Sequence, residues 1–161
     1  MLVITVEALA GGHWAHDRKG EEMDVVFLAG RILFAVLFLS SGLTVHMSRQ
    51  GVGYARAYGA PAPELMVPLS GAAIVAGGLA VALGIWADLG ALILAAFVLS
   101  IAPIMHAFWK EEDEQMKGIQ QAQFMKNIAL AGAALIVFYA YNQLQGAADL
   151  SITDPLFGRA D

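Results

Sequence analysis

The chain has 161 residues, of which 58% are hydrophobic and 14% are charged, and its mean hydropathy is +0.64. This composition is typical of an integral membrane protein and not of a soluble domain of the same length. With 9 basic against 14 acidic residues and no cysteine, the sequence offers neither a basic surface for nucleic acid nor a thiol for disulfide, redox or metal chemistry.

Residues 1–24 combine a short apolar run with a polar stretch, and they lack the basic start and the longer apolar core of a secretory signal. We predict that they form a polar or amphipathic extension that does not span the membrane. His13 and His16 have the spacing of a metal-binding pair, but histidines beside two glycines in a polar segment are usually solvated. We therefore assign no metal site to the chain.

Four apolar segments follow, each about twenty residues long, and a helix of that length covers the roughly 30 Å hydrocarbon core of a bilayer. They lie at about residues 25–47, 65–86, 89–109 and 123–141. The sequence therefore predicts an all-α integral membrane four-helix bundle, up-down-up-down, over residues 25–141. Residues 142–161 form a C-terminal tail, which we place on the surface.

Arg31 lies about two turns inside the first span, where a charge is costly unless it reaches the interface or meets a partner. An arginine that extends to the interface is the commoner arrangement, and an anion site is the alternative. Trp86, Ala87 and Asp88 make the tightest connection in the chain, so the second and third spans are antiparallel neighbours. Because Asp88 emerges on the side nearest Arg31, we predict an ion pair between them.

The other two connections, residues 48–63 and 110–122, lie on the opposite side of the membrane. The first is rich in glycine, proline, tyrosine and arginine, and we expect it along the interface. The second contains four consecutive acids, Glu111 to Glu114, which indicate a solvated loop. Pro103 frees a backbone carbonyl near the end of the third span, which favours a kink that turns His106 inward.

Chain counting places five side chains at about the same depth on this side: His46, His106, Trp109, Lys126 and Asn127. Histidine titrates in the range that proton-coupled redox chemistry uses. Two facing histidines bind a haem or a metal, or one of them donates a hydrogen bond to a quinone carbonyl. The alternative is that these residues are ordinary interfacial anchors.

Four motifs together resemble, in their order and spacing, the DoxX family of small four-helix bacterial membrane proteins. They are GRILFAVLFLSSG (30–42), the YGAPAPEL loop, HAFW (106–109) and FMKNIALAGA (124–133). The resemblance covers residues 23 to about 141. It implies a membrane subunit associated with electron transfer from thiosulfate to quinone, and mycobacterial relatives are linked to a membrane oxidoreductase complex with superoxide dismutase and a sulfurtransferase.

On this resemblance we expect a multi-pass subunit of an oxidoreductase or respiratory-type complex in a bacterial plasma membrane. Its partners would be the lipid bilayer and other protein subunits, and the five residues above would contact a quinone or a soluble redox partner. The sequence establishes no cofactor; quinone is the candidate, and haem is disfavoured. The alternative is a non-catalytic assembly subunit whose termini make the contacts. A permease is disfavoured because the spans lack a polar path.

Overall fold

The structure, a computed structural model, describes the backbone of residues 4–143 and 150–157, with side chains from Met23 onward. This part of the chain is helical and contains no strand. In chain order the elements are α1 (Ile4–Thr44), α2 (Arg49–Ala57), α3 (Pro63–Leu83), α4 (Ala87–Met105), the short 3-10 helix η1 (Phe108–Lys110) and α5 (Glu114–Gln143). The predicted all-α four-helix architecture is confirmed.

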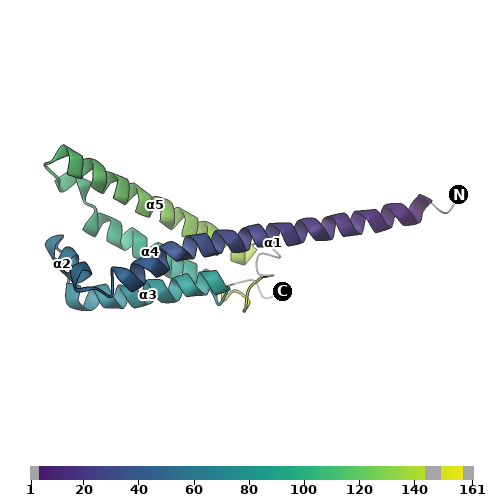
Figure 1. The fold of residues 1–161 in the computed structure, drawn as a ribbon, viewed down its shortest axis with the longest axis horizontal. Coiled ribbons are helices and arrows are strands. Elements are labelled where there is room, and N and C mark those ends of the chain that lie inside the picture. Colours follow the sequence, from purple (N-terminus) through teal and green to yellow (C-terminus); the bar gives the residue numbers. More distant parts are fainter. Residues whose placement is uncertain (1–3, 144–149, 158–161) are drawn as a thin grey trace.

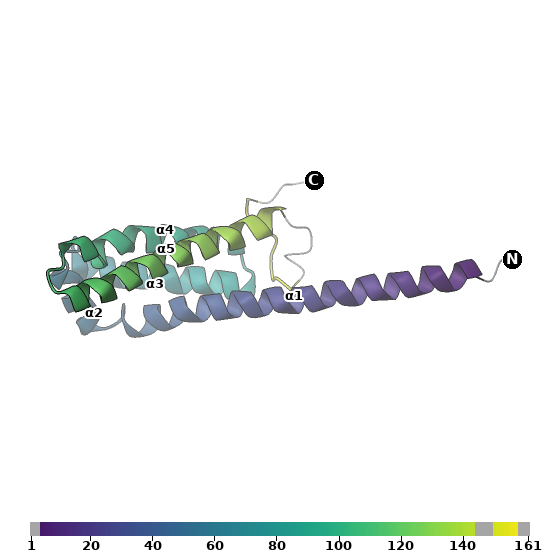
Figure 2. The ribbon, with the colours of Figure 1, turned by 90° about the horizontal axis from the view of Figure 1, so that it is seen from above.

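Four segments are long and apolar enough to cross a membrane. They are Met23–Thr44, Pro63–Leu83, Ala87–Lys110 and Glu114–Gln143. The first of these, Met23–Thr44, lies close to the predicted 25–47, and α1 is one helix from Ile4, so the residues before the span are helical as well. In Figure 2 this part of α1 extends well beyond the bundle.

The acidic loop is shorter than predicted, because α5 begins at Glu114 and not near residue 123. Asp113 explains the difference: its carboxylate oxygen accepts a hydrogen bond from the Met116 N–H at 2.8 Å, which is a side-chain cap. Glu114 then lies in the first turn, where the helix dipole favours a negative charge. The consecutive acids therefore start the helix as well as solvating the loop.

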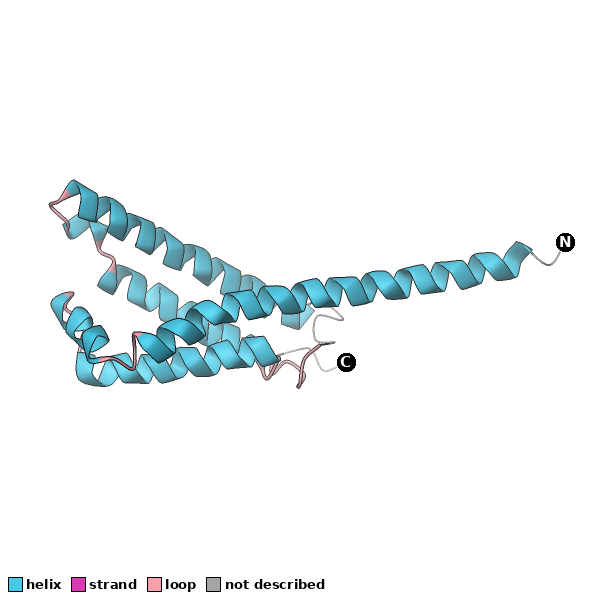
Figure 3. Ribbon diagram, in the orientation of Figure 1, coloured by secondary structure: helices cyan, strands magenta, loops and turns pink. Residues whose placement is uncertain are grey.

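The spans pack in chain order, α1 against α3, α3 against α4, and α4 against α5. Close approach of α3 and α4 depends on Gly77 and Gly90. A Cβ atom on Gly77 would lie 3.1 Å from the Gly90 carbonyl oxygen, and one on Gly90 would lie 2.9 Å from that of Gly77. These contacts lie near the α3–α4 turn. Toward the end that carries α2, α4 and α5 diverge from α1 and α3 (Figure 1). Figure 3 shows the same view coloured by secondary structure, with these segments as helices.

The α3–α4 turn has left-handed backbone at Gly84 (φ +67°) and Trp86 (φ +44°). Residues 150–157 bind this turn. The Ile152 N–H donates to the Leu83 and Gly84 carbonyls at 3.3 and 3.1 Å, and the Trp86 N–H donates to the Thr153 hydroxyl at 2.9 Å. The described part of the tail therefore closes one end of the bundle and satisfies backbone groups that the strained turn leaves open.

Arg31 is buried at this closed end, with 2% of its surface exposed, so the interpretation as an arginine that extends to the interface was wrong. Its guanidinium donates to the Tyr141 hydroxyl, and to the Ser151 hydroxyl and the Leu150 carbonyl at 2.6 Å each. The Phe27 ring lies 5.6 Å from the guanidinium carbon and adds a cation–π contact. The charge is therefore held inside the protein by its C-terminal residues.

Asp88 is fully buried near the same turn, and its Oδ2 accepts a hydrogen bond from the Phe157 N–H at 2.6 Å. The ion pairs among the described residues are Arg56–Glu64 and Lys117–Glu114, and the predicted Arg31–Asp88 pair is not among them. The physical reason is that the C-terminal segment supplies separate partners, so each charge is bound by a polar group of residues 150–157.

Replacing Gly84 by alanine should destabilise the protein by at least about 1–2 kcal/mol, because the left-handed backbone strains any other residue. The new methyl would also lie 2.4 Å from the Ser151 side chain. Thermal unfolding of the detergent-solubilised protein measures the effect. Gly132→Ala is the matched control, since a Cβ there meets nothing within 4 Å. Equal melting temperatures for the two variants would contradict this account of the turn.

Asp88→Asn should lower the melting temperature more than Asp24→Asn. The first change removes a charge-assisted hydrogen bond at a fully buried site. Asp24 is only half-buried and forms no ion pair among the described residues. Thermal unfolding in the same detergent compares the two variants, and equal shifts would count against a structural role for Asp88.

Candidate functional site

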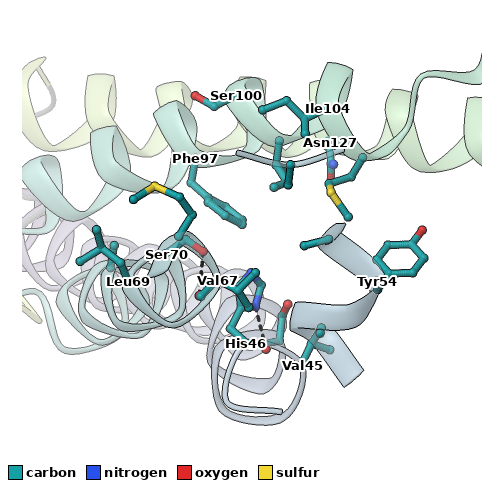
Figure 4. Close-up of a pocket in the computed structure, with 18 of the residues that line it drawn as sticks. Val45, His46, Tyr54, Val67, Leu69, Ser70, Phe97, Ser100, Ile104 and Asn127 are labelled. Carbon is teal, nitrogen blue, oxygen red and sulfur yellow. Dashed lines mark hydrogen bonds between the residues drawn. The ribbon is translucent and has the colours of Figure 1, made fainter. Parts of the chain in front are cut away.

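A cavity of about 450 Å³ lies at the end of the bundle opposite the α3–α4 turn. Its walls come from the end of α1, from α2, from the first turns of α3, from the second half of α4 and from α5, and most of the lining is apolar (Figure 4). The polar lining includes Ser41, His46, Ser70, Ser100, His106 and Asn127. A mostly apolar cavity of this size with few convergent polar groups is the usual form of a small-molecule site.

The cavity lies toward the end of the bundle where α4 diverges from α3 (Figure 1), and there α2 bridges the two helices, with Ala55, Val67 and Met105 in one buried cluster. Gly77 and Gly90 bring the helices into contact near the turn, and the facing residues farther along are larger, with Val67 on α3 and Phe97 and Ile101 on α4. Larger side chains keep two helix axes apart. The space that results at the far end is bounded by α2, which packs on α3.

His46 follows the end of α1, and its ring is fixed on both sides. Its Nδ1 lies 3.1 Å from the Ser41 carbonyl oxygen, and the ring meets Phe97 edge-on with centroids 5.6 Å apart. Gly71 of α3 lies directly behind it, because a Cβ atom there would be 2.5 Å from the His46 Cβ. The glycine therefore lets α1 come close enough to α3 to place this imidazole on the cavity wall.

His106 directly follows α4 and belongs to a hydrogen-bonded chain that also includes Gln120 and Tyr58. Its Nδ1 lies 2.8 Å from the Gln120 Oε1 atom, and the Gln120 amide nitrogen donates to the Tyr58 hydroxyl at 2.7 Å. Gln120 is 3% exposed, so its amide is satisfied inside the protein. This chain links the end of α4 to α5 and to the residue after α2, and it fixes the orientation of the His106 ring.

Tyr58 lies outside the spans, between α2 and α3. Burial raises the pKa of its hydroxyl, and the neighbouring Tyr54 and the carboxylate of Glu111 raise that pKa further. The Tyr54 and Tyr58 rings are 4.6 Å apart at their centroids. Tyr58 therefore keeps its proton over the physiological pH range, and its oxygen remains an acceptor for the Gln120 amide.

The structure brings four of the five predicted rim residues to one cavity: His46, His106, Lys126 and Asn127. Asn127 is 6% exposed and presents a side-chain amide to the cavity (Figure 4). The Lys126 ammonium donates to the Gln123 side chain, on the exposed part of the rim. Trp109 does not line the cavity; it is 53% exposed and packs against Phe108 and Phe124.

Sequence reasoning missed several residues that build the site. Phe97 looked like an ordinary apolar residue of the third span, and Gln120 lay in a predicted loop. A glutamine on the inward face of a helix indicates a buried hydrogen bond, but this face can be recognised only when the start of the helix is known. The start of α5 was predicted too late in the sequence, near residue 123 and not at Glu114. Tyr58 was counted as an interfacial residue, and its contact with Gln120 joins positions 62 apart in sequence.

The cavity can hold a flat or extended apolar molecule and hydrogen-bond to its polar end. The groups available for that purpose include two imidazoles, one amide and the hydroxyls of the lining serines. Within the described residues no group of three or more His, Cys, Asp or Glu side chains is placed to bind a metal ion. The arrangement therefore suits recognition of an organic molecule with a polar head.

Four apolar spans and a cavity at one end define a small multi-pass integral membrane protein. The DoxX family model matches residues 26–107, which is more than half of the chain and includes both cavity histidines. The chain belongs to the DoxX family. A comparison with curated proteins and one with solved structures each gave no match.

Gly71→Ala should displace His46 and destabilise the contact between α1 and α3, because the added methyl has no room beside the histidine. We expect a loss of about 1–3 kcal/mol in unfolding free energy. Gly53→Ala in α2 is the control, since a Cβ there meets nothing within 4 Å. Thermal unfolding compares the pair, and a Gly71→Ala protein as stable as the control would show that the close packing is not needed.

Proposed function

We propose that this protein is an integral membrane subunit of an oxidoreductase or respiratory-type complex in a bacterial plasma membrane, and that its cavity holds the ring of a quinone-type molecule. The observation that carries the proposal is the meeting of His46 and His106 at one apolar cavity of about 450 Å³. An isoprenoid quinone has a flat polar ring on a long apolar tail, so it matches an apolar cavity with few hydrogen-bonding groups.

The position of the cavity also supports a lipid-soluble ligand. Met66, Leu69 and Ile104 line it and are 39%, 57% and 36% exposed, on helices that are apolar enough to lie in a bilayer. A molecule in the bilayer therefore meets apolar side chains at the opening. The absence of cysteine means that any sulfur chemistry of such a complex belongs to another subunit.

The alternative is a non-catalytic assembly subunit, and one observation favours it. Helix α1 continues far beyond the bundle toward the N-terminus (Figure 2). A long helix of this kind is suited to bind another subunit. Gentle solubilisation, followed by identification of what copurifies, distinguishes the two functions. A stoichiometric large partner without bound quinone favours the assembly subunit, and a bound quinone favours the first function.

His46→Ala and His106→Ala should each lower the amount of isoprenoid quinone, in either redox state, that copurifies with the protein by about five- to tenfold, because each removes a hydrogen bond to the polar ring. Solvent extraction and chromatography measure the quinone per protein. Gln121→Ala, on the exposed face of α5, is the control. Wild-type protein without quinone, or variants with the wild-type amount, would exclude the proposed site.

A further inference from the structure

The hydrogen bonds already made by the cavity residues determine what kind of polar group a ligand must bring. The His46 Nδ1 faces the Ser41 carbonyl oxygen at 3.1 Å, and a carbonyl oxygen only accepts. The Nδ1 atom therefore carries the proton. In a neutral imidazole the other nitrogen, Nε2, then has a free lone pair and acts as an acceptor.

His106 is arranged in the same way by a different partner. Its Nδ1 faces the Gln120 Oε1 atom at 2.8 Å, and the amide nitrogen of Gln120 is used on the Tyr58 hydroxyl. The carbonyl end of the amide accepts, so Nδ1 of His106 donates, and its Nε2 atom is an acceptor as well. Among the described residues neither Nε2 atom has a hydrogen-bond partner.

Two serines of the lining follow the same pattern. The Ser70 hydroxyl donates to the Val67 carbonyl at 2.9 Å, and the Ser100 hydroxyl donates to the Ala96 carbonyl at 2.7 Å. Each hydroxyl donates its only hydrogen to a carbonyl of its own helix, so only its lone pairs remain for a ligand. The two imidazoles and these two serines therefore offer acceptors to a ligand, whereas the Lys126 ammonium and the Ser41 hydroxyl of the lining are donors. The Asn127 amide offers both a donor and an acceptor, so it does not discriminate between a ligand that donates hydrogen bonds and one that accepts them.

We propose that the cavity selects the reduced, hydroquinone form of its ligand, with the two ring hydroxyls donating to Nε2 of His46 and Nε2 of His106. This inference rests on the proposed function and adds the redox state to it. A quinone has two carbonyl acceptors, so its oxygens would face the lone pairs of the imidazoles without a hydrogen between them. An unmatched polar pair in an apolar cavity costs affinity.

Gln120 has a positioning role in the binding of the hydroquinone form. Gln120 does not need to touch the ligand; its carbonyl keeps His106 in the tautomer that accepts. Without that carbonyl, His106 takes either tautomer and the cavity loses part of its preference. Tyr58 contributes only by binding the other end of the same amide.

Three probes of the same shape test the inference on the purified full-length protein in nanodiscs, without oxygen. They are duroquinol, duroquinone and the dimethyl ether of duroquinol, which has no hydroxyl hydrogen. Titration calorimetry should show duroquinol binding at least tenfold more tightly than either of the others, since two hydrogen bonds separate them. The His46→Ala/His106→Ala double variant measures partition of the probes into the lipid.

Gln120→Leu should reduce the ratio of duroquinol to duroquinone affinity by about threefold to tenfold, whereas Tyr58→Phe, which leaves the Gln120 carbonyl on His106, should preserve it. Ring ¹⁵N spectra of histidine-labelled protein, assigned with the two single alanine variants, should show a proton on Nδ1 at both positions. Equal loss of both probes in Gln120→Leu would reduce that residue to a structural one and overturn its positioning role.

Duroquinone or the dimethyl ether binding as tightly as duroquinol would overturn the selection for the hydroquinone form and leave a quinone site intact. Binding of none of the three probes above the partition seen in the double variant would overturn the proposed function itself, and this inference with it. A proton on Nε2 of His46 or His106 would contradict the acceptor assignment directly.

Discussion

The hydrogen bonds between residues 150–157 and the α3–α4 turn are the interaction on which the rest of the structure depends. They hold the left-handed backbone at Gly84 and Trp86, and they bind Arg31 and Asp88 at the same end. That end is closed and α3 and α4 are in direct contact there, whereas at the other end α2 bridges them through the buried cluster of Ala55, Val67 and Met105. The cavity lies at this second end.

The polar groups at the two ends of the bundle have different roles: those at the closed end stabilise the fold, and those at the other end are available to a ligand. A buried guanidinium and a buried carboxylate are costly unless they are hydrogen-bonded, and at the closed end the C-terminal segment binds both terminal nitrogens of Arg31 and one carboxylate oxygen of Asp88, while Nε of Arg31 and Oδ1 of Asp88 have no partner among the described residues. At the open end the two imidazoles and two serine hydroxyls bind protein acceptors with their hydrogens. These groups therefore keep lone pairs for a ligand, at the end where an apolar molecule has room to enter.

The fold could be predicted from the sequence because hydrophobic length is a local property, and four runs of about twenty residues leave little choice. The common depth of His46, His106 and Asn127 followed from counting crossings. The partners of Arg31 and Asp88 could not be predicted, since Ser151 and Phe157 lie in a tail without hydrophobic periodicity. Counting gives depth and not direction, so it could not show that Trp109, in the short helix η1, lies outside the cavity lining.

The central claim is that the cavity between the diverging helices binds the ring of a quinone-type molecule. Photolabelling with an azido-quinone, followed by mass spectrometry of the proteolysed protein, tests it most directly. We predict labelled peptides from the end of α1 near His46 and from α4 between Phe97 and His106. Labelling confined to the closed end near Trp86, or spread evenly over the outer faces of the spans, would contradict the account.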